Sequence, residues 1–519
     1  MTERRRELAE QVANDHARGA LSRREAIRRL GVLGIGGAAA TGLADVLRPA
    51  PAVAAAPAPG LHDEREIQGN ILQAFGGQYQ AFVFVTFGNK RTEARAWLAG
   101  AAGRVDTTGD VMAARTGSGI AAGTSLMGLG LTATGLVTLH PEVAAELARF
   151  EAFWLGPLGN RLDDAGRLTT TPTLLGDVGA SHPAKWLIGG PGRPPVDALL
   201  TLAAEDEATL RRRVAQERQA VTQAGLAVLS VDGEDQQWGV TLRNTDGKRT
   251  EHFGFVDGLT QPGVRGVHGA TDTTAIAAGE FLLGFAGERR PMALGQRPSA
   301  ADWMWGGSFQ VFRRLRQDVA GWWAKMDQLS GADGTPEEVA ARAMGRKLDG
   351  TPLASGGEGF TFEDDPHGRK TPLYAHIRKM NPRHDEVFRD RSHRILRRGI
   401  PYGPAMDRGR PDDADRGMLF NAYMAGIEDQ FEFLQRRWAN DPKVTSETLS
   451  KFGKKGATSD GFDPVIGDGP DVAAKRLGKD AVKGVPPLAF GGFVTTTGSV
   501  YAFTPTRAAL RLLSTDSSL

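Results

Sequence analysis

The spacing of apolar and polar residues predicts alternating strands and helices in the first half of the chain. Residues 80–87 combine aromatic and β-branched side chains between glycines, a pattern typical of a central strand. An Ala-rich stretch containing Trp97 and Leu98 follows and predicts a helix. Residues 198–202 then indicate a short strand, and residues 205–224 indicate an amphipathic helix with a strongly charged face.

A similar succession recurs in the second half of the chain. Helices are predicted over residues 318–329 and 428–438. Strands are predicted over residues 281–285, 308–312 and 418–425, with a closing strand pair around Thr497-Gly498 in residues 492–504. Strands mixed with helices on one side fit an α+β architecture, in two copies, better than a regular parallel α/β fold.

The length of 519 residues is also compatible with two large packed units. We place the first domain at residues 60–265 and the second at residues 266–519. Two stretches rich in Gly and charged residues, 331–368 and 457–483, are predicted to be insertions in the second domain. Within the first of these insertions, residues 338–347 are expected to be helical.

Residues 1–54 differ in composition from everything that follows. The segment Ser22-Arg23-Arg24-Glu25-Ala26 precedes a weakly apolar, Gly/Ala-rich run over residues 30–44, and small residues with A-x-A spacing end at Ala54. The apolar run has too few residues to span a bilayer, which requires about 20. The segment resembles a twin-arginine export signal, although Ala26 stands where such signals usually have Phe. The alternative is an amphipathic first helix of the mature fold.

Export of this kind carries proteins that have already folded, often with a cofactor in place, so the resemblance implies a periplasmic or extracellular protein. Removal of residues 1–54 would take away nine of the 63 basic residues and six of the 61 acidic ones, leaving 54 against 55. The remaining chain is therefore close to neutral, and it has no run of 18 apolar residues. We expect no nucleic-acid partner and no integral membrane segment in the mature form. An oligomer is compatible with the sequence.

The composition restricts the chemistry that the chain can perform. The sequence has no cysteine, which excludes disulfides, thiolate metal sites, a cysteine nucleophile and covalent haem attachment through C-x-x-C-H. The chemistry must therefore come from histidines, carboxylates, arginines or a cofactor held without covalent bonds.

Three segments carry candidate chemistry. In residues 252–262, Asp257 lies in a turn bounded by glycines, where the backbone can bend tightly. In residues 375–383, His376 precedes a basic cluster, and a single neutral imidazole can ligate iron. In residues 391–403, apolar residues interrupt an Arg-rich run that includes Arg397. Taken singly, each has a simpler explanation: an Asp that supports its own turn, a structural His, and a basic surface loop.

In this order the three segments resemble the dye-decolourising peroxidase family, which are haem enzymes of the dimeric α+β-barrel type. Gly254, Asp257 and Gly258 match the G-x-x-D-G motif of the family, and Thr371 stands where the family often has Cys. The resemblance covers about residues 64–515. Further similar segments are Glu66–Leu72, Gly279–Phe285, Gly307–Arg313, Arg416–Phe420, Gln430–Gln435 and Asp463–Gly467.

The resemblance implies two ferredoxin-like domains with antiparallel sheets and peripheral helices. It also implies non-covalent haem b, with His376 as the proximal iron ligand and Asp257 and Arg397 as the distal catalytic pair. Asp429 or Glu432 is expected to accept a hydrogen bond from the ring of His376. Further cofactor-binding residues are expected to be Arg378, Gly258, Met418 and Phe420, of which the last two would form a dry distal wall or simply belong to the core.

The activity implied is oxidation of dyes, phenols and other aromatic reductants by hydrogen peroxide through a ferryl intermediate. Members of the family relay oxidation to the surface through Tyr or Trp, but for each candidate here ordinary packing is the better interpretation: Tyr374, Tyr402, Trp303, Trp305, Trp322 and Trp323. Two alternatives remain. One is an exported haem-binding or iron-releasing protein on the same scaffold, and the other is an α+β binding module without haem, in which His376 is structural.

Overall fold

The structure is a computed structural model of the chain. It describes residues 65–519 except 118, 164, 268–274, 289–296, 332–333, 355–356, 367, 384–391, 442–460, 468–490 and 518. The predicted leader, residues 1–54, therefore lies outside the described residues, as does most of the predicted insertion at 457–483. No helix in the described part of the chain combines the length and the hydrophobicity needed to cross a bilayer.

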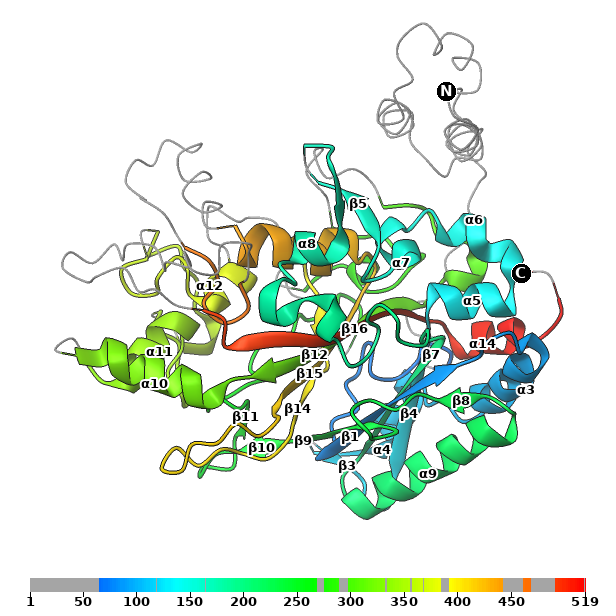
Figure 1. Ribbon diagram of the computed structural model, residues 1–519, viewed down its shortest axis with the longest axis horizontal. Coiled ribbons are helices and arrows are strands. Elements are labelled where there is room, and N and C mark those ends of the chain that lie inside the picture. The colour runs from blue at the N-terminus through cyan, green and yellow to red at the C-terminus, as the bar shows by residue number, and fades with distance from the viewer. Residues whose placement is uncertain are drawn as a thin grey trace, which may run out of the picture.

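One large antiparallel sheet of ten described strands forms the centre of the molecule (Figure 1). Its strand order is β13-β15-β12-β16-β4-β7-β1-β8, with β14 paired to β15 and β9 paired to β1. The first half of the chain contributes β1 (Tyr79–Thr86), β4 (Ser125–Leu131), β7 (Ala198–Ala204), β8 (Ala227–Val228) and β9 (Gln237–Val240). The second half contributes β12 (Ser308–Gln317), β13 (Leu396–Arg397), β14 (Ile400–Tyr402), β15 (Gly417–Met424) and β16 (Val494–Thr504).

Shorter described strands form two-stranded ribbons beside this sheet. They are β2 (Arg115–Thr116), β3 (Gly119–Ile120), β5 (Asn160–Leu162), β6 (Leu168–Thr170), β10 (Leu242–Arg243) and β11 (Arg249–Thr250).

Helices cover the sheet, as the amphipathic patterns predict (Figure 1). The longer ones are α3 (Arg91–Ala102), α9 (Glu207–Gln223), α10 (Val319–Ser330) and α11 (Pro336–Met344). Asp206 caps α9 by accepting a hydrogen bond from the backbone N–H of Thr209. The shorter ones are α4 (Thr108–Ala114), α5 (Ala133–Leu139), α6 (Ala144–Leu147), α7 (Glu151–Leu155), α8 (Thr171–Leu175), α12 (His376–Met380) and α14 (Arg507–Leu513). The helix predicted over 428–438 is a pair of π-helical segments, Glu428–Glu432 and Leu434–Ala439.

The apolar core lies on both faces of the sheet. On the outer face, alternate residues of β1 such as Val83 pack with Leu98 of α3 and Leu210 of α9. On the inner face the two halves of the sheet meet, because the ring of Phe82 in β1 lies 4.9 Å from the ring of Phe312 in β12. Strands buried on both faces explain why the segments of β1 and β7 are almost continuously apolar.

These findings confirm the α+β class and the antiparallel sheet, but the described strands do not close a barrel by hydrogen bonding. Strands β16 and β4 join the two halves through the pair Phe503–Leu131. At the other end, no described pairing links β13 or β14 to β8 or β9. There the contact is one of side chains, with Ile400 of β14 packed against Gly239 of β9. The domain boundaries at residues 265 and 266 stay predictions.

Two strand predictions were wrong. Residues 281–285 form turns that follow a 3-10 helix (Ala278–Glu280), and Gly284 has a φ of +84°, which a strand does not accommodate. Phe281 and Leu282 are apolar because they are buried in a core cluster rather than because they form a strand. Residues 492–504 contain the single strand β16 instead of a strand pair. Its register with β12 shifts beside Thr497 and Gly498, so the predicted turn is a bulge.

The contact between β9 and β14 yields a prediction for stability. A Cβ added at Gly239 would overlap Cγ2 of the buried Ile400. We expect Gly239→Ala to lower the free energy of unfolding by about 1–3 kcal/mol, the usual cost of overpacking. Chemical denaturation measures this change, and Gly103→Ala is the control because its Cβ would meet the nearest atom at an ordinary 3.6 Å. If Gly239→Ala lowered the free energy of unfolding equally in an Ile400→Ala background, overlap with Ile400 would not be the cause.

Candidate functional site

A cavity of about 1100 Å³ lies against the outer face of the second half of the sheet. The register between β12 and β15 determines which side chains form this wall. Leu315 of β12 pairs with Met418 of β15, and Arg313 pairs with Phe420. Opposed residues in an antiparallel pair point to the same face, so all four side chains face the cavity, as its lining confirms. Large parts of the remaining lining come from the loop at 255–263, helix α12, residues 393–399 and the π-helical segments.

Asp257 enters the cavity from a loop that the sequence bends sharply. Gly254 and Gly258 have φ values of +98° and +77°, which a residue with a Cβ adopts only under strain. The backbone N–H of Asp257 donates to the carbonyl of Arg249 (3.0 Å), and its Oδ1 accepts from the N–H of Gly258 (2.6 Å). The carboxylate is therefore held at the cavity wall in a defined orientation.

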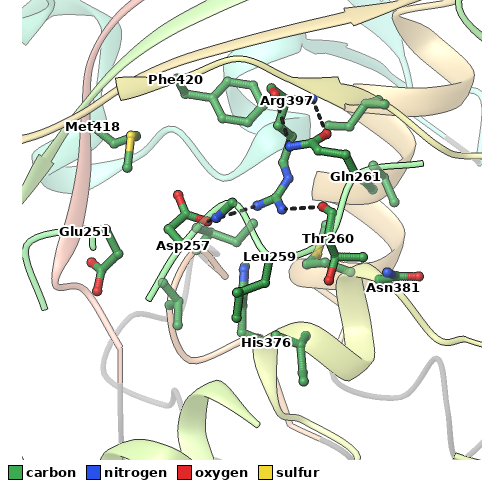
Figure 2. A pocket seen from close by; sticks show the side chains of 18 of the residues that line it. Glu251, Asp257, Leu259, Thr260, Gln261, His376, Asn381, Arg397, Met418 and Phe420 are labelled. Carbon is green, nitrogen blue, oxygen red and sulfur yellow. Dashed lines mark hydrogen bonds and ion pairs between the residues drawn. The ribbon is translucent and has the colours of Figure 1, made fainter. Parts of the chain in front are cut away.

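Arg397 reaches the same place from β13, which is 140 residues further along the chain. Its Nη1 lies 3.9 Å from Oδ1 of Asp257, and its Nη2 donates to the carbonyl of Thr260 (3.1 Å; Figure 2). The two side chains are each about two-fifths exposed, and both line the cavity. An acid and a fixed cation thus stand side by side where a small molecule can reach them.

His376 lies across the cavity from this pair (Figure 2). It is the first residue of α12, and its Nδ1 lies 2.8 Å from Oδ2 of Asp463, which is buried. The other oxygen of Asp463 accepts from the backbone N–H groups of Val465 (2.8 Å) and Ile466 (3.0 Å). With Nδ1 engaged by a carboxylate, the imidazole can present Nε2 as a metal ligand.

The charge of Asp463 is maintained despite its burial. Burial by itself raises the pKa of this carboxyl, but the ring of His376 and the two backbone N–H groups outweigh that effect, so the pKa lies below its usual value. A carboxylate on Nδ1 fixes the tautomer of the ring and increases the basicity of the other nitrogen.

The expected partner of His376 was wrong. Asp429 accepts hydrogen bonds from Arg297, and Glu432 binds Arg161 and Tyr501, so neither carboxylate is free to approach His376. The acceptor is Asp463, which lies 87 residues after the histidine. The segment Asp463–Gly467 is among those that resemble the family, but nothing in its pattern indicates that this turn reaches α12.

Arg378 was also placed wrongly among the cofactor-binding residues. Its guanidinium is buried, donates to the carbonyl of Thr371 (2.9 Å), approaches Asp365 (3.4 Å) and stacks over Phe362. It does not line the cavity, because a residue two positions after His376 points to a different side of the helix. The other predicted residues, Gly258, Met418 and Phe420, do line the cavity.

Arginines that the sequence prediction omitted line the cavity instead. Arg383 donates to Oγ1 of Thr260 (2.9 Å), and Arg394 and Arg346 also contribute to the lining. The basic composition of residues 375–383 and 391–403 was the signal for them, but composition does not show which arginine faces inward. Five of the six aromatic candidates for electron transfer are buried, and Trp305 is partly buried. This burial agrees with the packing interpretation.

The donor set fits haem better than a bare metal ion. Among the described residues, no cluster of three or more His, Asp or Glu side chains is arranged to hold a metal. An iron atom bound through His376 alone would need its other ligands from a macrocycle. The cavity offers apolar walls at Met418, Phe420 and Leu434 for such a ring, and guanidinium groups at Arg383 and Arg394 for its carboxylates.

A histidine backed by a carboxylate on one side of a cavity, with an acid and an arginine on the other, is the arrangement of a histidine-ligated haem peroxidase. Comparison with known proteins agrees with this class. Residues 286–464 match the family model of the C-terminal part of Dyp-type peroxidases. A multifunctional dye peroxidase of Amycolatopsis is 32% identical over 486 residues, which cover 86% of this chain and 95% of the relative. The chain belongs to the DyP-type peroxidase family.

Two further relatives show how far the similarity extends. The solved structure of a dye-decolorizing peroxidase in complex with 2,6-dimethoxyphenol superposes with a TM-score of 0.67 at 22% identity, covering 88% of this chain and all of that one. A deferrochelatase of Yersinia pestis is 33% identical over 155 residues, but these cover only 29% of this chain and 31% of the relative.

The contact between Asp463 and His376 can be tested by replacement. We expect Asp463→Asn to weaken haem binding about 10- to 100-fold, because the ring loses the carboxylate that fixes its tautomer. Titration of the haem-free protein with haem, followed by visible absorption, measures this affinity. Asp429→Asn is the matched control because the structure places Asp429 on Arg297, away from His376. Wild-type affinity in Asp463→Asn would contradict the assigned role.

Proposed function

We propose that the chain is a haem b peroxidase that uses hydrogen peroxide to oxidise dyes, phenols and other aromatic reductants. Its membership of the DyP-type family makes it a haem-dependent oxidoreductase. The observation that supports the mechanism is the pair formed by Asp257 and Arg397, which faces His376 across one cavity. In the net reaction, one molecule of hydrogen peroxide takes up two protons and two electrons, the electrons coming from the reductant. The products are two molecules of water.

His376 is the residue that would hold the iron, through Nε2, while Asp463 orients the ring through Nδ1. Arg383 and Arg394 would pair with the carboxylates of the macrocycle, and Met418 and Phe420 would supply apolar wall beside it. When bound, haem iron supplies the oxidation and reduction that no side chain of this protein can provide.

Asp257 and Arg397 would act on the peroxide itself. Asp257 would accept a proton from one oxygen of the peroxide and deliver a proton to the other, which a carboxylate within hydrogen-bond reach can do. Arg397 stabilises the negative charge that develops as the two oxygens separate. The carbonyl of Thr260 holds the guanidinium in place before the reaction, so little reorganisation is needed.

Aromatic reductants are proposed from the relatives. The Amycolatopsis protein is described as a dye peroxidase, and a phenol is bound in the solved structure of the dye-decolorizing peroxidase. A role in haem handling is supported less well, because the similarity to the deferrochelatase is confined to under a third of the chain. A carrier also has no use for an acid and an arginine on the open face of the cavity.

Visible absorption of the purified protein, before and after one equivalent of hydrogen peroxide, tests the proposal. We expect the spectrum of a high-spin ferric haem, a change within seconds of adding peroxide, and recovery when a dye is added. A haem spectrum that peroxide leaves unchanged would favour the haem-handling role. Failure to bind haem on reconstitution would refute both.

Three variants test the proposed residues. We expect His376→Ala to lose haem because the iron loses its protein ligand. Asp257→Asn and Arg397→Leu should keep haem but react with peroxide at least about 100-fold more slowly, since each lacks a group that acts on the transition state. Stopped-flow absorption measures the reaction, with haem content as the control. Wild-type rates in both distal variants would refute the mechanism.

We also propose that residues 1–54 direct export by the twin-arginine route, on the basis of the paired Arg23 and Arg24 before a short apolar run. Replacing both arginines with lysine should keep the full-length protein in the cytoplasm of a host that has this route. Cell fractionation with an antibody measures the distribution. Export that is unchanged by the double replacement would contradict the proposal.

A further inference from the structure

The main chain of Arg397 lies at a free edge of the sheet. Strand β13 has β15 on one side, and the N–H of Arg398 donates to Asn421 of that strand (2.6 Å). Peptide groups in an antiparallel pair point alternately toward and away from the partner. The N–H and C=O of Arg397 therefore point away from β15, where no described strand is paired with them.

The side chain of Gln261 occupies the place of that missing strand. Its Oε1 accepts from the N–H of Arg397 (3.2 Å), and its Nε2 donates to the C=O of Arg397 (3.1 Å; Figure 2). These two partners fix which end of the amide is oxygen and which is nitrogen. A primary amide can accept with its oxygen and donate with its nitrogen, as a neighbouring peptide would.

The same loop also binds the guanidinium of Arg397. Thr260 lies directly before Gln261. Its carbonyl accepts a hydrogen bond from Nη2 of Arg397, and its hydroxyl accepts one from Arg383. Asp257 lies only four residues before Gln261. One short segment thus carries the acid and the groups that hold both the main chain and the side chain of the arginine.

Arg397 needs such support because its own contact with Asp257 is weak. The two groups are 3.9 Å apart and partly exposed, and an ion pair of this kind contributes little to holding a long side chain in one conformation. The rate of a catalysed reaction is nevertheless sensitive to the position of such a group, since a displacement of about 1 Å can slow a reaction about 100-fold.

We propose that Gln261 is a positioning residue for the peroxide reaction. Its amide holds the main chain of Arg397 as a substitute strand, so that the guanidinium stays beside Asp257. This inference rests on the proposed function, in which Arg397 stabilises the charge that develops on the peroxide. It predicts that Gln261 acts through Arg397 and not on the peroxide or the cofactor.

The test uses Gln261→Met in the full-length, haem-loaded protein, because methionine keeps the length of the side chain and loses both hydrogen bonds. We expect unchanged haem content and a reaction with peroxide that is about 10- to 100-fold slower by stopped-flow absorption. Gln223→Met, on the exposed end of α9, is the matched control. Gln261→Asn, which is too short to reach both groups, should be slowed similarly and serves if the methionine variant does not fold.

Two further measurements separate positioning from a general structural effect. Hydrogen exchange at the peptide containing residues 396–398 should become faster in Gln261→Met, because the N–H of Arg397 loses its acceptor. In an Arg397→Leu background, Gln261→Met should cause no additional loss of rate, because the group that it positions is absent.

Unchanged exchange in Gln261→Met, a wild-type peroxide rate, or losses that add in the double variant would each overturn the inference. A wild-type protein that binds haem but does not react with peroxide would instead refute the proposed function. Failure of the inference about Gln261 and failure of the proposed function are therefore distinguishable, because the latter is seen in the wild-type protein.

Discussion

The register of β12, β15 and β13 is the constraint on which the site depends. Side chains alternate between the two faces of a strand, so a slip of one residue would exchange Met418 and Phe420 for Leu419 and Asn421 at the cavity. The inner face prevents such a slip because Phe312 and Leu419 are packed against residues of β1. The site is therefore specified by a core on the opposite face of the same strands.

The site also depends on buried charges whose partners are backbone groups. Arg398 is buried, and it donates to the carbonyls of Asn70 and Ile71 at 2.8 Å. Burial lowers its pKa to about 10, which still leaves it charged at neutral pH. This residue ties the start of the first half of the chain to the strand that carries Arg397. Asp463 likewise relies on two backbone N–H groups as well as on His376.

Two sides of one cavity have different tasks, and the structure separates them in space. On the side of α12, His376 and Asp463 form a unit suited to holding a metal in one orientation. On the opposite side, Asp257, Arg397 and the segment 260–261 form a unit suited to proton transfer and charge stabilisation. In the proposed function, the first unit would hold the cofactor and the second would act on the peroxide.

The sequence by itself determined the class of fold and supplied the candidate residues of the site. The long apolar strands, such as residues 80–87 and 308–312, were predictable because their pattern is local. Asp257, His376 and Arg397 were candidates because their segments, taken together, resemble the family, and all three line one cavity. Short apolar runs are ambiguous without their surroundings, which is why residues 281–285 were mistaken for a strand.

The tertiary structure alone decided which distant groups meet. Asp463 rather than Asp429 or Glu432 reaches His376, Arg383 rather than Arg378 faces the cavity, and Gln261 replaces a strand beside Arg397. Each of these choices depends on how a loop returns to a helix or an edge strand from far away in the chain. Local pattern shows which residues are able to donate, accept or carry charge, but the distance between two of them is set by packing.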